Sequence, residues 1–156
     1  METQSVLNHP LVAVIENMKF LRTVEILPVR GELLEIHVAG ADVLDDPHTV
    51  AGIEDVRSVE VLSNSRVYAF SFPKFVAYAV TDEMFIHSKT TEIFEGGRVR
   101  LYSKSHFRDY VSSVSWATSD FPGTLLHCQI NTLDHTVDVV TAAPLELVML
   151  EEKADN

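Results

Sequence analysis

The sequence predicts an α+β domain in which helices pack on one face of an antiparallel sheet of about six to eight strands. Two observations support this fold class. Several short segments alternate apolar and polar side chains, which is typical of half-buried strands, and two segments have apolar residues at helical spacing. No repeat or linker divides the 156 residues, so we expect one domain over 1–156 with a polar tail at 150–156. Whether the sheet curls around a cavity stays open.

The first expected element is a helix that begins at Pro10 and ends before Pro28. Proline is favoured at the first helical position, where its missing N–H costs nothing, and the residue that precedes a proline avoids helical angles. The apolar residues between the two prolines share one helical stripe. They are Leu11, Val14, Ile15, Met18 and Leu21.

Alternation over 34–38 next predicts a strand, which we expect Gly40 to end. The Asp-Asp-Pro sequence at 45–47 is typical of a helix start, with Asp46 as the cap, so a short helix is expected there. Residues 56–80 then indicate β structure with a turn at 63–65. Pro73 interrupts that stretch and marks a bulge or a strand end.

A Gly-Gly pair at 96–97 indicates a tight hairpin. Pairing across it places Glu95 opposite Arg98, and opposite charges favour that register. The period then changes from 2 to 3.6, which predicts a helix over 106–117 with Ser105 as its cap. The apolar residues at helical spacing are Phe107, Tyr110, Val111 and Val114.

The last third predicts a hairpin with a two-residue loop at Thr132-Leu133, followed by an edge strand over 145–149. This register places His127 opposite Asp138. A His–carboxylate pair of this kind can act as an oriented base or as half of a metal site. The alternative is an ordinary solvated sheet face, and a one-residue register error would separate the pair. The polar face contains His127, Gln129, Asn131, Asp134, Thr136 and Asp138.

An acid-free stretch with basic side chains and hydroxyls lies just before and inside the predicted helix at 106–117. A helix N-terminus attracts anions, so this stretch predicts a local anion-binding site. The alternative is a surface whose basic residues pair with the abundant acids. The candidate residues are Arg98, Arg100, Ser103, Lys104, Ser105 and Arg108.

The charge balance is strongly acidic: 12 Lys and Arg face 23 Asp and Glu, which gives a net charge of −11. Such a surface repels nucleic acid and anionic lipid, so neither is expected as a partner. It suits a protein that covers a basic partner surface, because complementary charge speeds encounter. Immunity proteins against nuclease toxins are similar in size and charge, although no motif is shared. The candidate contact acids are Asp42, Asp45, Asp46, Glu54 and Asp55.

The single cysteine, Cys128, excludes an intramolecular disulfide and a zinc site built on several thiolates. Its place on the apolar face of a predicted strand favours a small buried hydrophobe over a nucleophile. No GxSxG sequence is present, and we expect no metal or cofactor. A set of aromatic residues belongs either to the core or to a pocket. These are Phe70, Phe72, Tyr78, Tyr110 and Trp116.

The sequence therefore predicts a cytoplasmic binding or protein-interaction domain that is not an enzyme and that can form a homodimer. The first five residues lack a basic region followed by an apolar run, and no apolar stretch approaches the roughly 20 residues that cross a bilayer. The alternative is a small enzyme or small-molecule-binding protein with the His–carboxylate or anion site. That alternative requires the polar face of the last hairpin to line a cavity.

Overall fold

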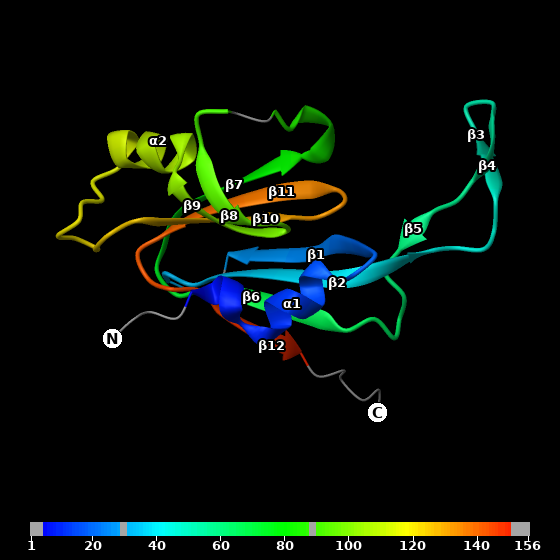
Figure 1. The fold of residues 1–156 in the computed structure, drawn as a ribbon, viewed down its shortest axis with the longest axis horizontal. Helices are drawn as coiled ribbons and strands as arrows, with labels where there is room; N and C mark the ends of the chain where they lie inside the picture. The colour runs from blue at the N-terminus through cyan, green and yellow to red at the C-terminus, as the bar shows by residue number, and fades with distance from the viewer. Residues whose placement is uncertain (1–4, 29–30, 88–89, 151–156) are drawn as a thin grey trace.

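Two antiparallel five-stranded sheets face each other across an apolar core in the computed structural model, which describes residues 5–28, 31–87 and 90–150 (Figure 1). The first sheet has the order β1 (Phe20–Pro28), β2 (Leu34–Val43), β6 (Val67–Phe72) and β12 (Glu146–Leu150), and β5 (Val59–Glu60) also pairs with β2. The second has the order β7 (Phe75–Asp82), β11 (His135–Thr141), β10 (Leu126–Asn131), β9 (Val99–Lys104) and β8 (Ile93–Gly96).

Side-chain alternation explains the core between the sheets. On β2, Leu34, Ile36 and Val38 are fully buried, and on β10 and β11 the inward residues include Ile130 and Val137. Burying each such side chain stabilises the fold by roughly 1.5–3 kcal/mol. The inward faces of both sheets are therefore apolar, and the outward face of the second sheet is free to carry polar groups.

The coarse prediction is confirmed: the fold is α+β with antiparallel strands. The strands are divided among several sheets, however, and not placed in one. Pro73 marks the end of β6, as expected, and there the chain crosses from the first sheet to the second. The alternation before and after Pro73 is the same whether the two strands pair in one hairpin or belong to different sheets. The sequence therefore did not show the division into two sheets.

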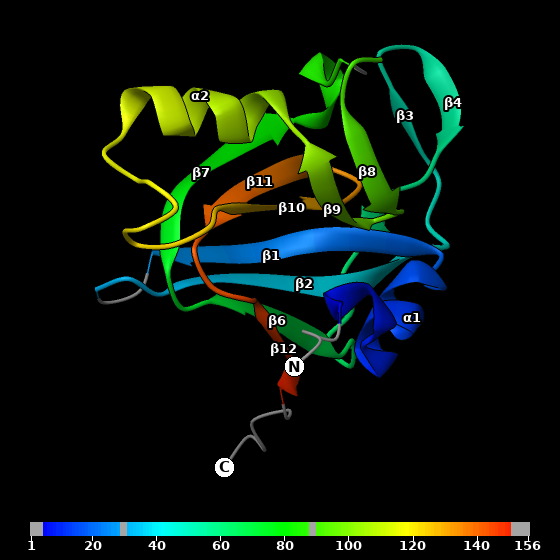
Figure 2. The same cartoon turned by 60° about the vertical axis from the view of Figure 1, so that its left-hand side comes forward.

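The helices lie on different parts of the sandwich. α2 (His106–Val114) covers the outer face of the second sheet, whereas α1 (Pro10–Glu16) lies beside the first sheet (Figure 2). α1 joins the main core through Val12 and Ile15. The two short 3₁₀ helices are η1 (Val6–Asn8) and η2 (Glu83–Phe85). The prediction of two helices on one face of the sheet was therefore wrong in its arrangement. No helix in the described part of the chain is long and apolar enough to cross a membrane.

The first helix is shorter than predicted. It ends at Glu16, and β1 begins at Phe20. Leu21 fits the helical stripe but lies in β1, where it pairs with Gly40 and is buried. β2 continues through Gly40 to Val43, so the prediction that Gly40 ends this strand was wrong. The Met18 Sδ lies 3.3 Å from the position that a Cβ of residue 40 would take.

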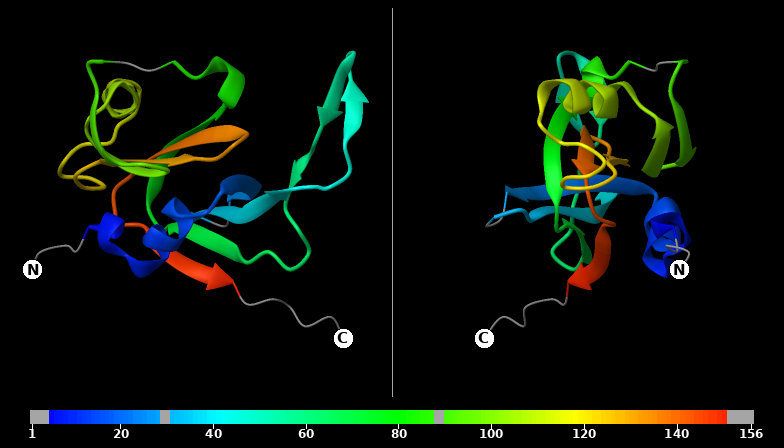
Figure 3. Two further views of the ribbon diagram at one scale, coloured as in Figure 1. Left: turned by 45° about the vertical axis from the view of Figure 1, so that its right-hand side comes forward. Right: turned by 90° about the vertical axis from the view of Figure 1, so that its left-hand side faces the viewer.

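The helix predicted at 45–47 was wrong. A two-stranded hairpin, β3 (His48–Val50) and β4 (Ile53–Val56), forms instead and projects from the sandwich (Figures 1 and 3). Ala51 and Gly52 at its turn have positive φ angles, as a tight hairpin turn requires. Val50 and Ile53 are exposed, and no other helix or strand of the described residues covers the hairpin.

The remaining predictions were correct in kind but differ in detail. The turn at 63–65 and the Ser105 cap of α2 are present, and α2 ends at Val114. β12 is an edge strand, as expected. The hairpin at 96–97 has a longer connection than predicted, so Glu95 faces Leu101 and not Arg98. Most of the predicted polar tail, 151–156, lies outside the described residues.

Candidate functional site

A pocket of about 240 Å³ lies on the outer face of the second sheet, between β10, β11, the start of α2 and the segment that follows η2. The polar face of the last hairpin thus lines a cavity, as the small-molecule interpretation requires. The lining residues are Thr81, Phe85, Ile86, His87, Glu92, His106, Phe107, His127, Gln129, Thr136 and Asp138.

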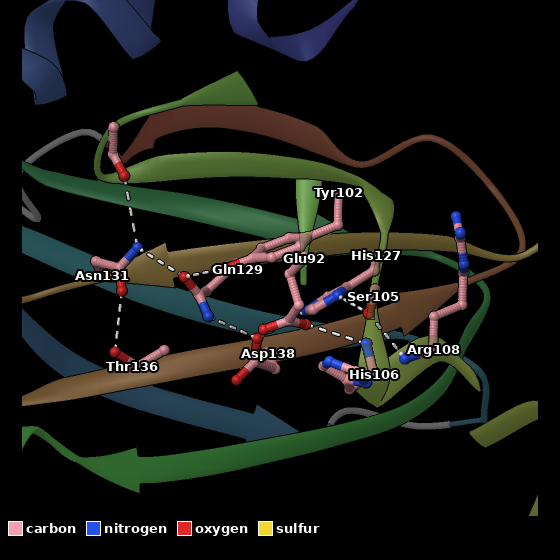
Figure 4. Close-up of polar contacts among 11 residues, drawn as sticks. Glu92, Tyr102, Ser105, His106, Arg108, His127, Gln129, Asn131, Thr136 and Asp138 are labelled. Atoms are coloured by element: carbon pink, nitrogen blue, oxygen red, sulfur yellow. Dashed lines mark hydrogen bonds and ion pairs between the residues drawn. The ribbon is translucent and has the colours of Figure 1, made fainter. Parts of the chain in front are cut away.

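The predicted His–carboxylate pair is present at the floor of this pocket. His127 Nε2 lies 2.7 Å from Asp138 Oδ1, and the His127 side chain is only 1% exposed (Figure 4). The imidazole stacks on the Tyr102 ring at 4.3 Å, and the edge of Phe107 meets it from another side. Packing on two sides and a hydrogen bond together fix the orientation of this ring.

Ser105 holds the other imidazole nitrogen. Its Oγ lies 2.6 Å from His127 Nδ1 and also accepts the N–H of Arg108 as the cap of α2. A carboxylate only accepts hydrogen bonds, so the contact with Asp138 places the His127 proton on Nε2. The Ser105 hydroxyl then donates to Nδ1. One hydroxyl therefore connects the first turn of α2 to the pocket floor.

The Ser105–His127–Asp138 chain resembles a hydrolytic triad in composition but not in geometry. Ser105 is 1% exposed and does not line the pocket, so a substrate has no access to its hydroxyl. A triad also needs the nucleophile on the nitrogen that faces the substrate, with the carboxylate behind the ring. Here it is the carboxylate that lines the pocket. Ser105 is therefore a positioning residue, and Asp138 is the group available to a ligand.

Asp138 is held on one oxygen only. Its Oδ1 accepts from His127 Nε2 and from Gln129 Nε2 at 2.9 Å (Figure 4). Gln129 is itself fixed, because its Oε1 accepts from the Tyr102 hydroxyl and from Asn131 Nδ2. Asp138 Oδ2 makes no hydrogen bond with the described residues, and the side chain remains 17% exposed. An oriented carboxylate with one free oxygen is thus offered to the pocket.

Burial changes the pKa of two groups next to this hydrogen-bond network. It raises the pKa of the Tyr102 phenol, although contacts with Arg100 partly oppose that effect. The neutral phenol therefore remains a hydrogen-bond donor to Gln129 throughout the physiological range. Burial also raises the pKa of the Cys128 thiol far above its usual range, which leaves this cysteine, as expected, a buried hydrophobe.

The register of the last hairpin differs from the prediction. Gln129 faces Asp138, whereas His127 faces Val140. The Thr132 N–H bonds to the His135 carbonyl at 2.8 Å, so the turn lies at Leu133 and Asp134, one residue later than predicted. His127 still reaches Asp138, because diagonal neighbours on one sheet face are close enough for long side chains to interact.

The predicted anion-binding residues are not gathered at one point. Arg98 donates to the Ile15 and Met18 carbonyls at the end of α1, and Arg100 lies over the Phe94 ring. At the other end of β9, Arg108 donates to the Ser103 carbonyl, while Lys104 is exposed and Ser105 is buried against His127.

A carboxylate of this chain already sits at the N-terminus of α2. Glu92 Oε2 accepts the His106 N–H at 3.0 Å. It occupies the position at the helix N-terminus where an external anion was predicted to bind. The anion site therefore stays a prediction without a gathered set of side chains.

Sequence reasoning missed several pocket residues, including Gln129 as the second donor to Asp138. The alternation of β10 placed Gln129 on the polar face, but only the true register pairs it with Asp138. Phe85 and Glu92 gave no signal, since they come from segments outside the hairpin. Among the described residues, no three His, Cys, Asp or Glu side chains form a group that could hold a metal ion.

Comparison of the chain with protein-family models, curated proteins and solved structures found no match.

Proposed function

We propose that this protein binds a small organic amine in the pocket above β10 and β11, with Asp138 as the main recognition group. The observation that carries this proposal is the pair of hydrogen bonds from His127 and Gln129 to one oxygen of Asp138. They orient the carboxylate before a ligand arrives, which lowers the entropic cost of binding.

The charge of the described lining favours an amine. Asp138 and Glu92 supply two carboxylates, and none of the lining residues in the described part of the chain is lysine or arginine. A charge-assisted hydrogen bond from an ammonium group to a carboxylate is about twice as strong as a neutral one. The Phe85 and Phe107 rings provide apolar area for the rest of the ligand. The volume of about 240 Å³ is below the usual range of about 300–1,000 Å³ for drug-sized ligands, so the ligand is small.

Three probes of nearly equal shape test this proposal: 2-phenylethylamine, 2-phenylethanol and 3-phenylpropanoate. We expect the amine to bind most tightly and the carboxylate least, by calorimetric titration and by amide shifts of pocket residues in NMR spectra. Asp138→Asn keeps the shape of the side chain and removes its charge, and we expect it to weaken amine binding at least about tenfold.

Asp109→Asn is the matched control, since Asp109 is an exposed acid of α2 that does not line the pocket. It should leave the affinity unchanged. Failure of all three probes to shift pocket residues in the folded protein would refute the proposal. Equal binding by wild type and by the Asp138→Asn variant would refute the role of the carboxylate.

A second candidate function is binding to a basic protein through the projecting hairpin. The acids predicted to make this contact are all exposed, and four of them lie on or beside β3 and β4, which project from the sandwich (Figure 3). An exposed acidic hairpin with the apolar residues Val50 and Ile53 suits a basic surface with an apolar centre. The five acids are Asp42, Asp45, Asp46, Glu54 and Asp55.

Comparative capture tests this second function. A variant with Asp45→Asn, Asp46→Asn, Glu54→Gln and Asp55→Asn should lose a salt-sensitive partner that the wild-type protein retains at low ionic strength. A variant with Asp109→Asn and Asp120→Asn, two exposed acids elsewhere, should retain it. Identical capture by both variants would refute a role for the hairpin.

A further inference from the structure

A second cavity, of about 450 Å³, lies on the opposite side of β10 from the Asp138 pocket. It is bounded by the inward side chains of β9 and β10, by η1 and by the connection between β11 and β12. Leu101 and Cys128 face each other across β9 and β10 and form its inner wall, and Leu126, which is 41% exposed, lies nearer to solvent. The cavity falls within the usual range of about 300–1,000 Å³ for a small-molecule site.

The lining of this cavity carries no formal charge. The lining residues in the described part of the chain are apolar or carry a hydroxyl or thiol group, and none of them is Asp, Glu, Lys, Arg or His. The Thr141 hydroxyl is already used by the Lys74 and Ala143 carbonyls. Thr124 is exposed, and its hydroxyl makes no hydrogen bond with the described residues. The hydroxyl of Ser5, which is half-buried, accepts the Leu7 N–H at 3.4 Å. The polar groups available to a ligand are therefore two neutral hydroxyls, of which that of Thr124 lies nearer to solvent.

We propose that this cavity is a second ligand site, which binds an uncharged molecule with an alkyl chain and a terminal hydroxyl. The chain lies toward Cys128, and the ligand hydroxyl lies at Thr124. A medium-chain primary alcohol is the simplest member of this class. This site is separate from the Asp138 pocket, since among the described residues the two cavities have no lining residue in common.

A fatty acid fits the same space less well. Its carboxylate would leave water without a cationic partner, and desolvation of an unpaired charge is costly. The adjoining cavity of about 420 Å³, which shares Leu145, includes Glu146 among its lining residues. That carboxylate repels an anionic head group, so the electrostatics favour a neutral ligand over an anionic one.

A chain-length series tests the site directly. In titrations with 1-hexanol, 1-octanol and 1-decanol, followed by leucine and valine methyl shifts, the affinity should rise about fourfold for each added methylene. Sodium decanoate, at a concentration below its micelle threshold, should bind at least about tenfold more weakly than 1-decanol. No binding of 1-decanol, or equal binding of decanoate, would overturn the proposal.

Two neighbouring alanines provide matched variants. Ala142 lines the cavity and Ala143 does not, and both are half-buried. Ala142→Phe should fill the space and lower 1-decanol affinity at least about tenfold, whereas Ala143→Phe should leave it unchanged. Equal affinity of the two folded variants would place the alcohol elsewhere and overturn the proposal.

Proton contacts in NMR spectra give a test that needs no cavity variant. Nuclear Overhauser effects from the alkyl chain of bound 1-decanol should reach the β-protons of Cys128 and the methyl groups of Leu101, which lie side by side on β10 and β9. Bound 2-phenylethylamine should give no such effects at these two residues. Bound 1-decanol without an effect at Cys128 or Leu101 would contradict the proposed placement.

Discussion

His127 and Cys128 are neighbours on β10, yet they line two cavities of opposite character. The His127 side chain lies under α2 among hydrogen-bonding groups, and that of Cys128 points into the sandwich among leucines. Because successive side chains of a strand point to opposite faces, one strand serves both environments. The outward face of β10 is organised by directional bonds, and its inward face by packing.

This difference has an energetic consequence. A buried apolar side chain contributes in proportion to the area it removes from water, whereas a hydrogen bond contributes a smaller net amount but orients its partners. We therefore expect inward substitutions on β10 to lower stability most and outward substitutions to lower ligand affinity most.

The largest expected effect is on the inward face. Ile130 is fully buried in the main core, so Ile130→Ala should lower the free energy of unfolding by about 2–5 kcal/mol. Asn131→Ala, the next residue on the outward face, should cost about 0.5–1.5 kcal/mol, because mainly its hydrogen bonds are lost. Urea denaturation measures both values. Equal losses would contradict the division between the faces.

The division itself could be predicted from the sequence, but the partner sheet could not. Alternation over 126–131 correctly assigned Cys128 and Ile130 to the apolar side. Alternation does not encode which sheet covers that side, since Pro73 ends a strand equally well in a hairpin and in a crossing between sheets. The same ambiguity extended the first helix to Leu21, which satisfies both a helical stripe and a strand.

The next effect concerns the imidazole. His127→Leu keeps an apolar contact with the Tyr102 ring. It removes the hydrogen bonds that the imidazole makes with Ser105 and with Asp138. We expect a loss of about 1–3 kcal/mol in the free energy of unfolding, together with weaker amine binding. Thermal and urea unfolding, followed by calorimetric titration, measure the two effects. A variant of wild-type stability and affinity would show that the imidazole does not hold the carboxylate.

A smaller effect is expected at the cap of α2. Ser105→Ala should cost about 0.5–2 kcal/mol, because the Arg108 N–H loses its acceptor and His127 Nδ1 loses its donor. The exposed Ser103 is the control, and Ser103→Ala should change stability by less than about 0.5 kcal/mol. Because Ser105 is not placed as a nucleophile, its variant should retain most of the amine affinity. Complete loss of binding in a folded Ser105→Ala protein would contradict this role.

The candidate site was only partly predictable. The polar face of the last hairpin was visible as alternation, and His127 and Asp138 do meet, although by a diagonal contact and not by direct pairing. The bond between His127 and Ser105 joins a strand to a helix cap 22 residues away. Such a contact depends on how α2 lies over the sheet, which no local pattern encodes.

The smallest expected effect is a pH dependence at the loop of the same hairpin. Burial alone would raise the pKa of Asp134, but hydrogen bonds from the Thr132 hydroxyl and the Thr23 N–H outweigh it and lower the pKa. As the pH falls, the Asp134 carboxylate therefore takes up a proton in the unfolded chain before it does so in the folded protein. Asp134 stabilises the fold fully at pH values above its ordinary pKa. This contribution is lost as the pH falls through the lowered pKa of the folded protein. Asp134→Asn should flatten the loss of stability below about pH 4. Urea midpoints measured at acid pH compare the two proteins.

The most direct test of the central claim is the affinity for 2-phenylethylamine of the wild-type protein and of the Asp138→Asn variant, measured by calorimetric titration at one pH and one salt concentration. An oriented carboxylate at the pocket floor predicts binding to the wild type and at least about tenfold weaker binding to the folded variant. Equal affinities, or no binding to the wild-type protein, would contradict the claim that Asp138 is held by His127 and Gln129 to recognise a ligand.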